Sequence, residues 1–143
     1  MSDGDLFRLY SQRILALAAD IPHSDPLPAP DATAKKRAPL CGSTVEVALT
    51  VENGRITGYS QTVRACALGQ ASAAIFGHNI IGRSREEVQA LRDALARMLA
   101  GQGPVPTAPF AEYEILQAAQ DYPNRHGSIL LAPDATLLAF DQI

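Results

Sequence analysis

The alternating stretch around Asn53-Gly54 is the feature that most limits how this chain can fold. Apolar side chains occupy every second position from Val45 to Val51, and polar side chains fill most of the positions between them. This period of two is typical of a half-buried strand. Asn-Gly favours a type I′ turn, in which both central residues need φ > 0. Residues 55–64 are therefore expected to return as the antiparallel partner strand.

The only two cysteines of the chain, Cys41 and Cys66, flank this hairpin. The two-residue turn fixes the register, and an uninterrupted ladder places Cys41 opposite Cys66. A bulge at residues 57–58 would shift the register by one residue. The bulged register gives the better apolar pairs, Val45 with Val63 and Leu49 with Tyr59. In either register the two thiols become neighbours at the open end of the hairpin.

Length and composition limit the class of protein. The 143 residues, 47% of them hydrophobic, are enough for one compact domain over residues 1–143. The net charge of −3 and the dispersed basic residues give no sign of a nucleic-acid surface. No stretch approaches the roughly 20 apolar residues of a membrane span. The acidic N-terminal residues argue for a cytoplasmic protein, in which two cysteines favour free thiols or metal ligation over a disulfide framework.

Helical patterns lie on both sides of the hairpin. Residues 5–19 form an amphipathic pattern, and the proline-rich residues 21–39 are expected to form a linker after this N-terminal helix. Residues 67–81 are expected to be helical, and a Ser-Arg-Glu-Glu capping box opens a further helix over residues 84–100. A short helix is expected over residues 110–119.

The C-terminal segment is ambiguous on its pattern alone. Residues 128–131 and 136–140 could pair as a hairpin, or form one helix kinked at Pro133. The expected fold class is α+β. A small antiparallel sheet built on hairpin 44–64, with a third strand drawn from the 21–39 region, is covered on one face by the helices at 67–81, 84–100 and the tail. The N-terminal helix packs at the edge or floats.

The cysteines and the histidines each allow two interpretations. Cys66 stands at the start of a helix, where the dipole and the free N–H groups would stabilise a thiolate. Alternatively, it is a buried neutral cysteine in a tightly packed helix. His126 is, on its own, most simply a surface or capping histidine.

Several of these motifs resemble those of the U-type iron–sulfur cluster assembly scaffolds, the family of IscU, SufU and the N-terminal domain of NifU. The similar residues are Cys41-Gly42-Ser43 ahead of the hairpin and Cys66 followed by Gln70-Ala71-Ser72 in the next helix. The helical segment 84–122 between the second and third motifs is closest to the SufU-like branch. The resemblance covers nearly the whole chain and implies the family fold with a helical tail.

The sequence departs from the family pattern at two positions. Ser43 stands where the family has aspartate, and the third cysteine is absent. A gapless alignment of the tail puts Ser128 at that cysteine position, whereas an alignment on the His-Cys-Ser of IscU puts Gly127 there. The resemblance implies that Cys41 and Cys66 bind a transient iron–sulfur cluster or zinc, with His126 as the best third metal ligand.

Three functional hypotheses follow. The first is a scaffold or sulfur acceptor that is not an enzyme. Its partners would be a cysteine desulfurase and apo iron–sulfur acceptor proteins, with no nucleic acid or membrane partner, and it would be a monomer or weak dimer. The second is a degenerate paralogue that keeps the fold as an interaction or regulatory module without a cluster. The third, a thiol enzyme with His126 or His78 as base, has no supporting Cys–His spacing.

Overall fold

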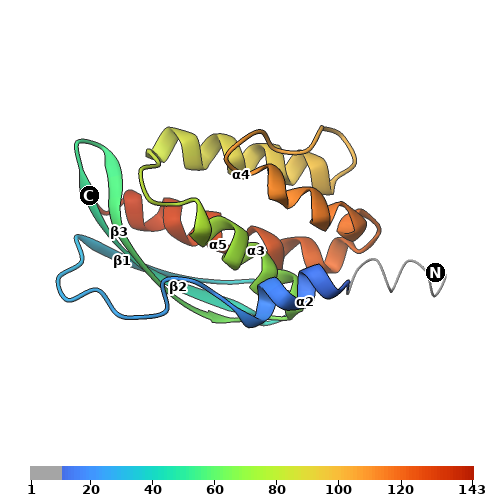
Figure 1. The fold of residues 1–143 in the computed structure, drawn as a ribbon, viewed down its shortest axis with the longest axis horizontal. Coiled ribbons are helices and arrows are strands. Elements are labelled where there is room, and N and C mark those ends of the chain that lie inside the picture. The colour runs from blue at the N-terminus through green and yellow to red at the C-terminus, as the bar shows by residue number, and fades with distance from the viewer. Residues whose placement is uncertain (1–10) are drawn as a thin grey trace.

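The computed structural model describes residues 11–143, so residues 5–10 of the expected N-terminal helix lie outside the described part. Within these residues, three strands and five helical segments follow one another (Figure 1). They are α2 (Gln12–Ala19), β1 (Ala32–Arg37), β2 (Thr44–Glu52), β3 (Arg55–Arg64), α3 (Ala67–His78), α4 (Arg85–Leu99), the 3-10 helix η1 (Ala111–Asp121) and α5 (Pro123–Phe140).

The expected hairpin is confirmed, and it takes the bulged register. Asn53 and Gly54 have φ of 53° and 77°, as a type I′ turn requires. The register shifts between Thr50 and Val51. Beyond the shift, the ladder contains the two expected apolar pairs, Val45 with Val63 and Leu49 with Tyr59. These side chains therefore face the core, and the open end of the hairpin leads to both cysteines.

Residues 21–39 are not a linker throughout, because Ala32–Arg37 pairs antiparallel with β2 as β1. The third strand expected from this region is thus confirmed, and only the stretch before it is irregular. Two hydrogen bonds hold that stretch against β3: Gln61 N donates to His23 O (2.9 Å) and Gln61 Nε2 donates to Pro22 O (3.1 Å). The pattern of β1 is weak because Ala32 is its only fully buried residue. Its Lys-Lys-Arg end suits an exposed edge strand.

The helices form two layers over one face of the sheet (Figure 1). Helix α5 packs across β1 and β2, and α3 packs beside it against β3. Helix α4 lies on the outer side, against α5 and η1, so it covers this face of the sheet as an outer layer. Helix α2 packs on α3 with Ile14 fully buried, which settles its position as packed and not floating.

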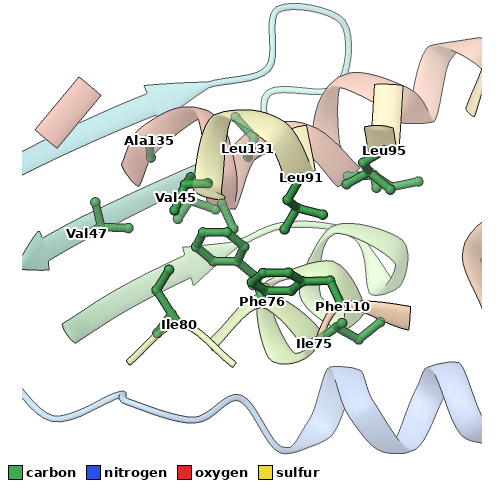
Figure 2. Packing of buried hydrophobic residues seen from close by; sticks show 14 of the residues in the cluster. Val45, Val47, Ile75, Phe76, Ile80, Leu91, Leu95, Phe110, Leu131 and Ala135 are labelled. Carbon is green, nitrogen blue, oxygen red and sulfur yellow. The ribbon is translucent and has the colours of Figure 1, made fainter. Parts of the chain in front are cut away.

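Aromatic side chains join α3 to its neighbours in the core (Figure 2). Phe76 is fully buried and stacks on Phe110, with ring centroids 5.9 Å apart and planes 19° apart. It also meets Tyr59 of β3 edge-on, at 6.2 Å. Both are favourable ring geometries. Phe76 thus fixes α3 between the sheet and the segment that precedes η1.

The C-terminal segment is one helix, as the family resemblance implied, although Pro133 lies inside it. A proline has no N–H to donate to the carbonyl four residues earlier, which here belongs to Ile129. The Ser72 hydroxyl of α3 donates to that Ile129 carbonyl at 2.6 Å. The acceptor freed by Pro133 is therefore satisfied by the neighbouring helix, which also fixes α5 beside α3.

Most helix ends lie close to where the sequence placed them. The capping box at Ser84 and Glu87 is formed, and Gly101, with φ of 73°, follows the end of α4. Helix α3 ends at His78, three residues earlier than expected, and the expected helix after residue 110 is of the 3-10 type. Between residues 11 and 143, none of the helices has the length and apolar character needed to cross a bilayer.

Candidate functional site

Cys41 is exposed at the tip of the turn that joins β1 to β2. Two backbone hydrogen bonds close this turn, Ala38 N to Ser43 O (2.8 Å) and Gly42 N to Ala38 O (3.0 Å). Gly42 adopts φ of 73°, which glycine reaches without strain. The closed turn folds the Cys41 thiol back onto the Ser43 hydroxyl, with Sγ and Oγ 3.1 Å apart.

Cys66 is half-buried at the N-cap of α3. Its sulfur precedes the first turn of α3, and the backbone N–H groups of Gly69 and Leu68 in that turn lower the pKa of its thiol. Its Sγ lies 3.6 Å from the Ser128 hydroxyl of α5. The expectation that Cys66 opens a helix is therefore confirmed.

Two buried serine hydroxyls join the thiols. Ser128 Oγ donates to Ser43 Oγ at 3.2 Å. The chain of contacts thus runs from Cys41 through Ser43 and Ser128 to Cys66. Gly69 is required for this approach, because a Cβ at that position would collide with the Ser128 hydroxyl. The site brings both cysteines to one pair of hydroxyls.

The thiols are more acidic than ordinary cysteines. Hydrogen bonding from Ser43 has the largest effect on the pKa of Cys41 and lowers it, burial opposes this, and Ser128 and the positive charge of Arg125 add smaller downward effects. Burial raises the pKa of Cys66, but hydrogen bonds from Gly69, Ser128, Leu68 and Arg125 outweigh it, so the net shift is downward. Both shifts raise the fraction of thiolate, the nucleophilic form, above that of an ordinary cysteine.

The helical geometry of α5 determines which of its side chains lie near Cys41 and Cys66. Arg125 and Ser128 are three residues apart and share one face of the helix. His126 is two residues from Ser128, which turns it to the opposite side. Its Nε2 bonds the Ala119 carbonyl at 2.7 Å, the position of a capping histidine. His126 is therefore not brought to the thiols as a third ligand, and of the two tail positions considered, Ser128 and not Gly127 places a side chain there.

The second histidine considered as a base also lies away from the pair. His78 is exposed at the last residue of α3, whereas Cys66 caps its first turn. A helix of 12 residues separates its ends by about 18 Å. No histidine of the described chain is hydrogen-bonded to either thiol, so nothing in the site supports a Cys–His nucleophile.

The donor set does not amount to a closed metal site. Over residues 11–143, no group of three or more histidine, cysteine, aspartate or glutamate side chains is arranged to hold a metal ion. The pair offers two thiols and two serine hydroxyls, and a hydroxyl stays protonated where a thiol ionises. Structural zinc and iron–sulfur clusters take four strong ligands. The chain supplies two of them.

These observations define the class of protein: a small α+β domain with two thiols of lowered pKa at the open end of its hairpin. A family model described as the NifU-like N terminal domain matches residues 9–128. The chain belongs to this family.

Known relatives agree with this assignment. A crystal structure of the N-terminal part of a nitrogen-fixing NifU-like protein from Brucella abortus has 40% sequence identity and a TM-score of 0.93, over 97% of this chain and 96% of that one. A putative iron–sulfur cluster assembly scaffold protein for the SUF system, from Fervidobacterium islandicum, has the same fold, with a TM-score of 0.78 over 93% and 97% of the chains at 18% identity. The iron–sulfur cluster assembly scaffold protein IscU of Streptococcus pyogenes is 26% identical over 87 residues. That alignment spans 61% of this chain and 55% of the relative.

Replacing Arg125 by glutamine is expected to raise the pKa of both thiols, because it removes the positive charge that stabilises each thiolate. In the wild type, the midpoint of the pH profile for alkylation by iodoacetamide should lie below that of an ordinary cysteine thiol. It should move upward in Arg125→Gln. Arg64→Gln is the matched control. Arg64 is the last residue of β3, at the open end of the hairpin, and has no contact with either thiol among the hydrogen bonds of the described residues. An unchanged midpoint in Arg125→Gln would contradict the role given to Arg125.

Proposed function

We propose that this chain acts in iron–sulfur cluster assembly as a sulfur acceptor, and that Cys41 and Cys66 carry the function. The observation that carries the proposal is the hydroxyl bridge of Ser43 and Ser128, which brings an exposed thiol and a half-buried thiol to one site. Membership of the NifU-like family and the likeness to a scaffold protein support this choice of process.

Sulfur acceptance needs an accessible thiolate. Cys41 is exposed in a turn, and Ser43 and Arg125 lower the pKa of its thiol. The thiolate can attack the outer sulfur of a persulfide presented by a partner, so that the sulfur passes to Cys41 and the partner's thiolate leaves. The partner we propose is a cysteine desulfurase, and the recipients are apo iron–sulfur proteins. In this role the chain carries sulfur and catalyses no reaction of its own.

A cluster, as the cargo of this process, would be held at the same place. Cys41 and Cys66 would supply two thiolates, and the other ligands would come from outside the chain, because Ser43 and Ser128 offer only hydroxyls. Zinc completed by His126 is not part of the proposal, since the His126 ring bonds the Ala119 carbonyl. We therefore expect a loosely held, transient cluster.

Incubation with a cysteine desulfurase and cysteine tests the proposal. We expect the wild-type chain to gain the mass of one sulfur atom, located on Cys41 or Cys66 by peptide mass spectrometry after thiol blocking. Cys41→Ser should lose most of this labelling because it removes the exposed thiol. The matched control is Ser24→Cys, which adds an exposed thiol in the segment before β1 and should not be labelled at residue 24.

The two main hypotheses predict different results. A sulfur acceptor is labelled at the pair and transfers the label to an apo iron–sulfur protein. A degenerate interaction module would bind a partner and stay unlabelled. Absence of sulfur on both Cys41 and Cys66, in a chain whose circular dichroism shows the native fold, would overturn the proposed function.

A further inference from the structure

We propose that Cys41 and Cys66 act together as a dithiol that releases accepted sulfur as sulfide and closes into an intramolecular disulfide. The inference rests on the proposed sulfur-acceptor function and deepens it, since it states what happens to the sulfur after it arrives. It is carried by the shared contacts of the two thiols and by the different exposure of each.

The two sulfurs are arranged as an outer and an inner thiol. The Ser128 hydroxyl lies 3.6 Å from Cys66 Sγ and 3.2 Å from the Ser43 hydroxyl, which lies 3.1 Å from Cys41 Sγ. Cys41 is exposed and can meet a partner, whereas Cys66 is half-buried and faces the hydroxyl pair. Cys41 lies in an exposed turn, where its side chain is free to change rotamer and move its sulfur relative to the two hydroxyls. An incoming sulfur on Cys41 therefore has a second thiol beside it.

Ser128 also limits the number of side chains in the site that can accept sulfur. A serine hydroxyl cannot accept the sulfur of a persulfide, so sulfur delivered to this site can reside only on Cys41 or Cys66. In the part of the chain that the structure describes, these are also the only cysteines. The thiol next to a persulfide on one cysteine is therefore always the other member of the pair.

The first step transfers sulfur and leaves the oxidation state of the pair unchanged. The Cys41 thiolate attacks the outer sulfur of a cysteine persulfide on the donor. A new S–S bond forms on Cys41, the S–S bond of the donor breaks, and the donor leaves as a thiolate. Cys41 then carries a persulfide, and Cys66 is still a thiol.

The second step releases sulfide. The Cys66 thiolate attacks the Cys41 sulfur atom itself, which is the inner sulfur of the persulfide. A Cys41–Cys66 disulfide forms, the bond to the outer sulfur breaks, and that sulfur leaves with the bonding pair as HS⁻. The two thiols together supply the two electrons that reduce the outer sulfur to the level of sulfide. A dithiol reductant must then reduce the disulfide before the next cycle.

The surroundings of the pair favour this second step. Cys66 is the N-cap of α3, and the N–H groups of Leu68 and Gly69 stabilise its attacking thiolate. Arg125 shares one face of α5 with Ser128 and lowers the pKa of both thiols, so its positive charge acts on the pair from which HS⁻ departs. A cation at that place lowers the cost of the developing negative charge.

A low-molecular-weight persulfide, glutathione persulfide, tests the step without a desulfurase. With the wild type we expect one equivalent of sulfide, loss of both alkylatable thiols, and a monomeric chain that has lost two hydrogen atoms by mass. With Cys66→Ser the persulfide should remain on Cys41, and sulfide should appear roughly 100-fold more slowly, because the neighbouring thiol is gone. Cys66→Ala serves as a second variant if the serine disturbs α3.

Each outcome separates this inference from the proposed function. If the desulfurase labels the pair but the wild type keeps its persulfide and free thiol, the dithiol step is wrong and sulfur acceptance stands. If glutathione persulfide yields sulfide and the internal disulfide but the desulfurase never labels the chain, the partner in the proposed function is wrong and the dithiol step stands. A disulfide that joins two chains, and not Cys41 to Cys66, would also overturn the inference.

Discussion

The double variant Ser43→Asp/Ser128→Cys is expected to bind zinc on the order of 10⁴-fold more tightly than the wild type, and to hold it at one equivalent per chain. Structural zinc sites contribute about 10–16 kcal/mol through four ligands, so each strong ligand is worth several kcal/mol. The wild-type pair supplies two thiolates, and the variant would supply three thiolates and a carboxylate, which together complete a tetrahedral set.

The structure supports the geometry of this variant. The Ser43 and Ser128 hydroxyls are 3.2 Å apart and each contacts a cysteine sulfur, so new ligand atoms at these positions start beside the thiols. Both serines are buried, which limits the motion of the replacing side chains. Gly69 leaves the space beside residue 128 free of a Cβ.

Competition against a chromophoric zinc chelator measures the change in affinity, and metal analysis after gel filtration gives the stoichiometry. The single variants Ser43→Asp and Ser128→Cys should each give an intermediate affinity. Ser24→Cys has the same number of thiols as Ser128→Cys, but its third thiol is exposed in the segment before β1, so it should bind zinc like the wild type. If Ser24→Cys matched the double variant, the gain would come from thiol count and not from the site.

The hairpin was predictable because its determinants are local. Asn53-Gly54 allows few turn types, and the alternation from Val45 to Val51 fixes which face is buried. The bulge was predicted from the better apolar pairs that it creates. The register in turn predicted that Cys41 and Cys66 lie close together. Nothing beyond residues 41–66 was needed for this part of the site.

The contribution of α5 to the site was missed, because the direction of its side chains depends on the residue at which the helix begins. The sequence left the tail open between helix and hairpin, so His126 was judged by its chemistry alone. Once α5 is known to start at Pro123, the spacing of Arg125 and Ser128 puts them on one face and His126 on another. A helix assignment from Pro123, the favoured first helical position for proline, was the signal that could have found Arg125.

The edge strand β1 was only partly predictable for a different reason. Its residues are small or basic, and Ala32 alone is fully buried, so its alternation is too weak to stand out beside four nearby prolines. Its pairing with β2 is a tertiary effect: the neighbouring strand supplies the hydrogen-bond partners that the sequence pattern does not reveal.

Replacing Phe76 by alanine is expected to have the largest effect on stability, at about 3–5 kcal/mol. The side chain is fully buried and stacks on Phe110 (Figure 2). It also meets Tyr59 edge-on, so its loss removes both ring contacts and leaves a cavity. At roughly 2–4 °C per kcal/mol for a chain of this size, the melting temperature should fall by about 6–20 °C. Urea denaturation gives the free energy of unfolding, and calorimetry gives the melting temperature.

The effect should depend on where the residue lies and not on hydrophobic content alone. Phe76→Leu keeps an apolar side chain in the same space and should cost about 1–2 kcal/mol. Leu138→Ala is the matched control, because Leu138 is 40% exposed on α5 and its truncation should cost about 1 kcal/mol or less. Phe76 fixes the helix whose first turn carries Cys66, so Phe76→Ala should also raise the pKa of the Cys66 thiol by loosening its hydrogen bonds to Ser128 and Arg125. Equal losses of stability in Phe76→Ala and Leu138→Ala would show that α3 is not held by this aromatic contact.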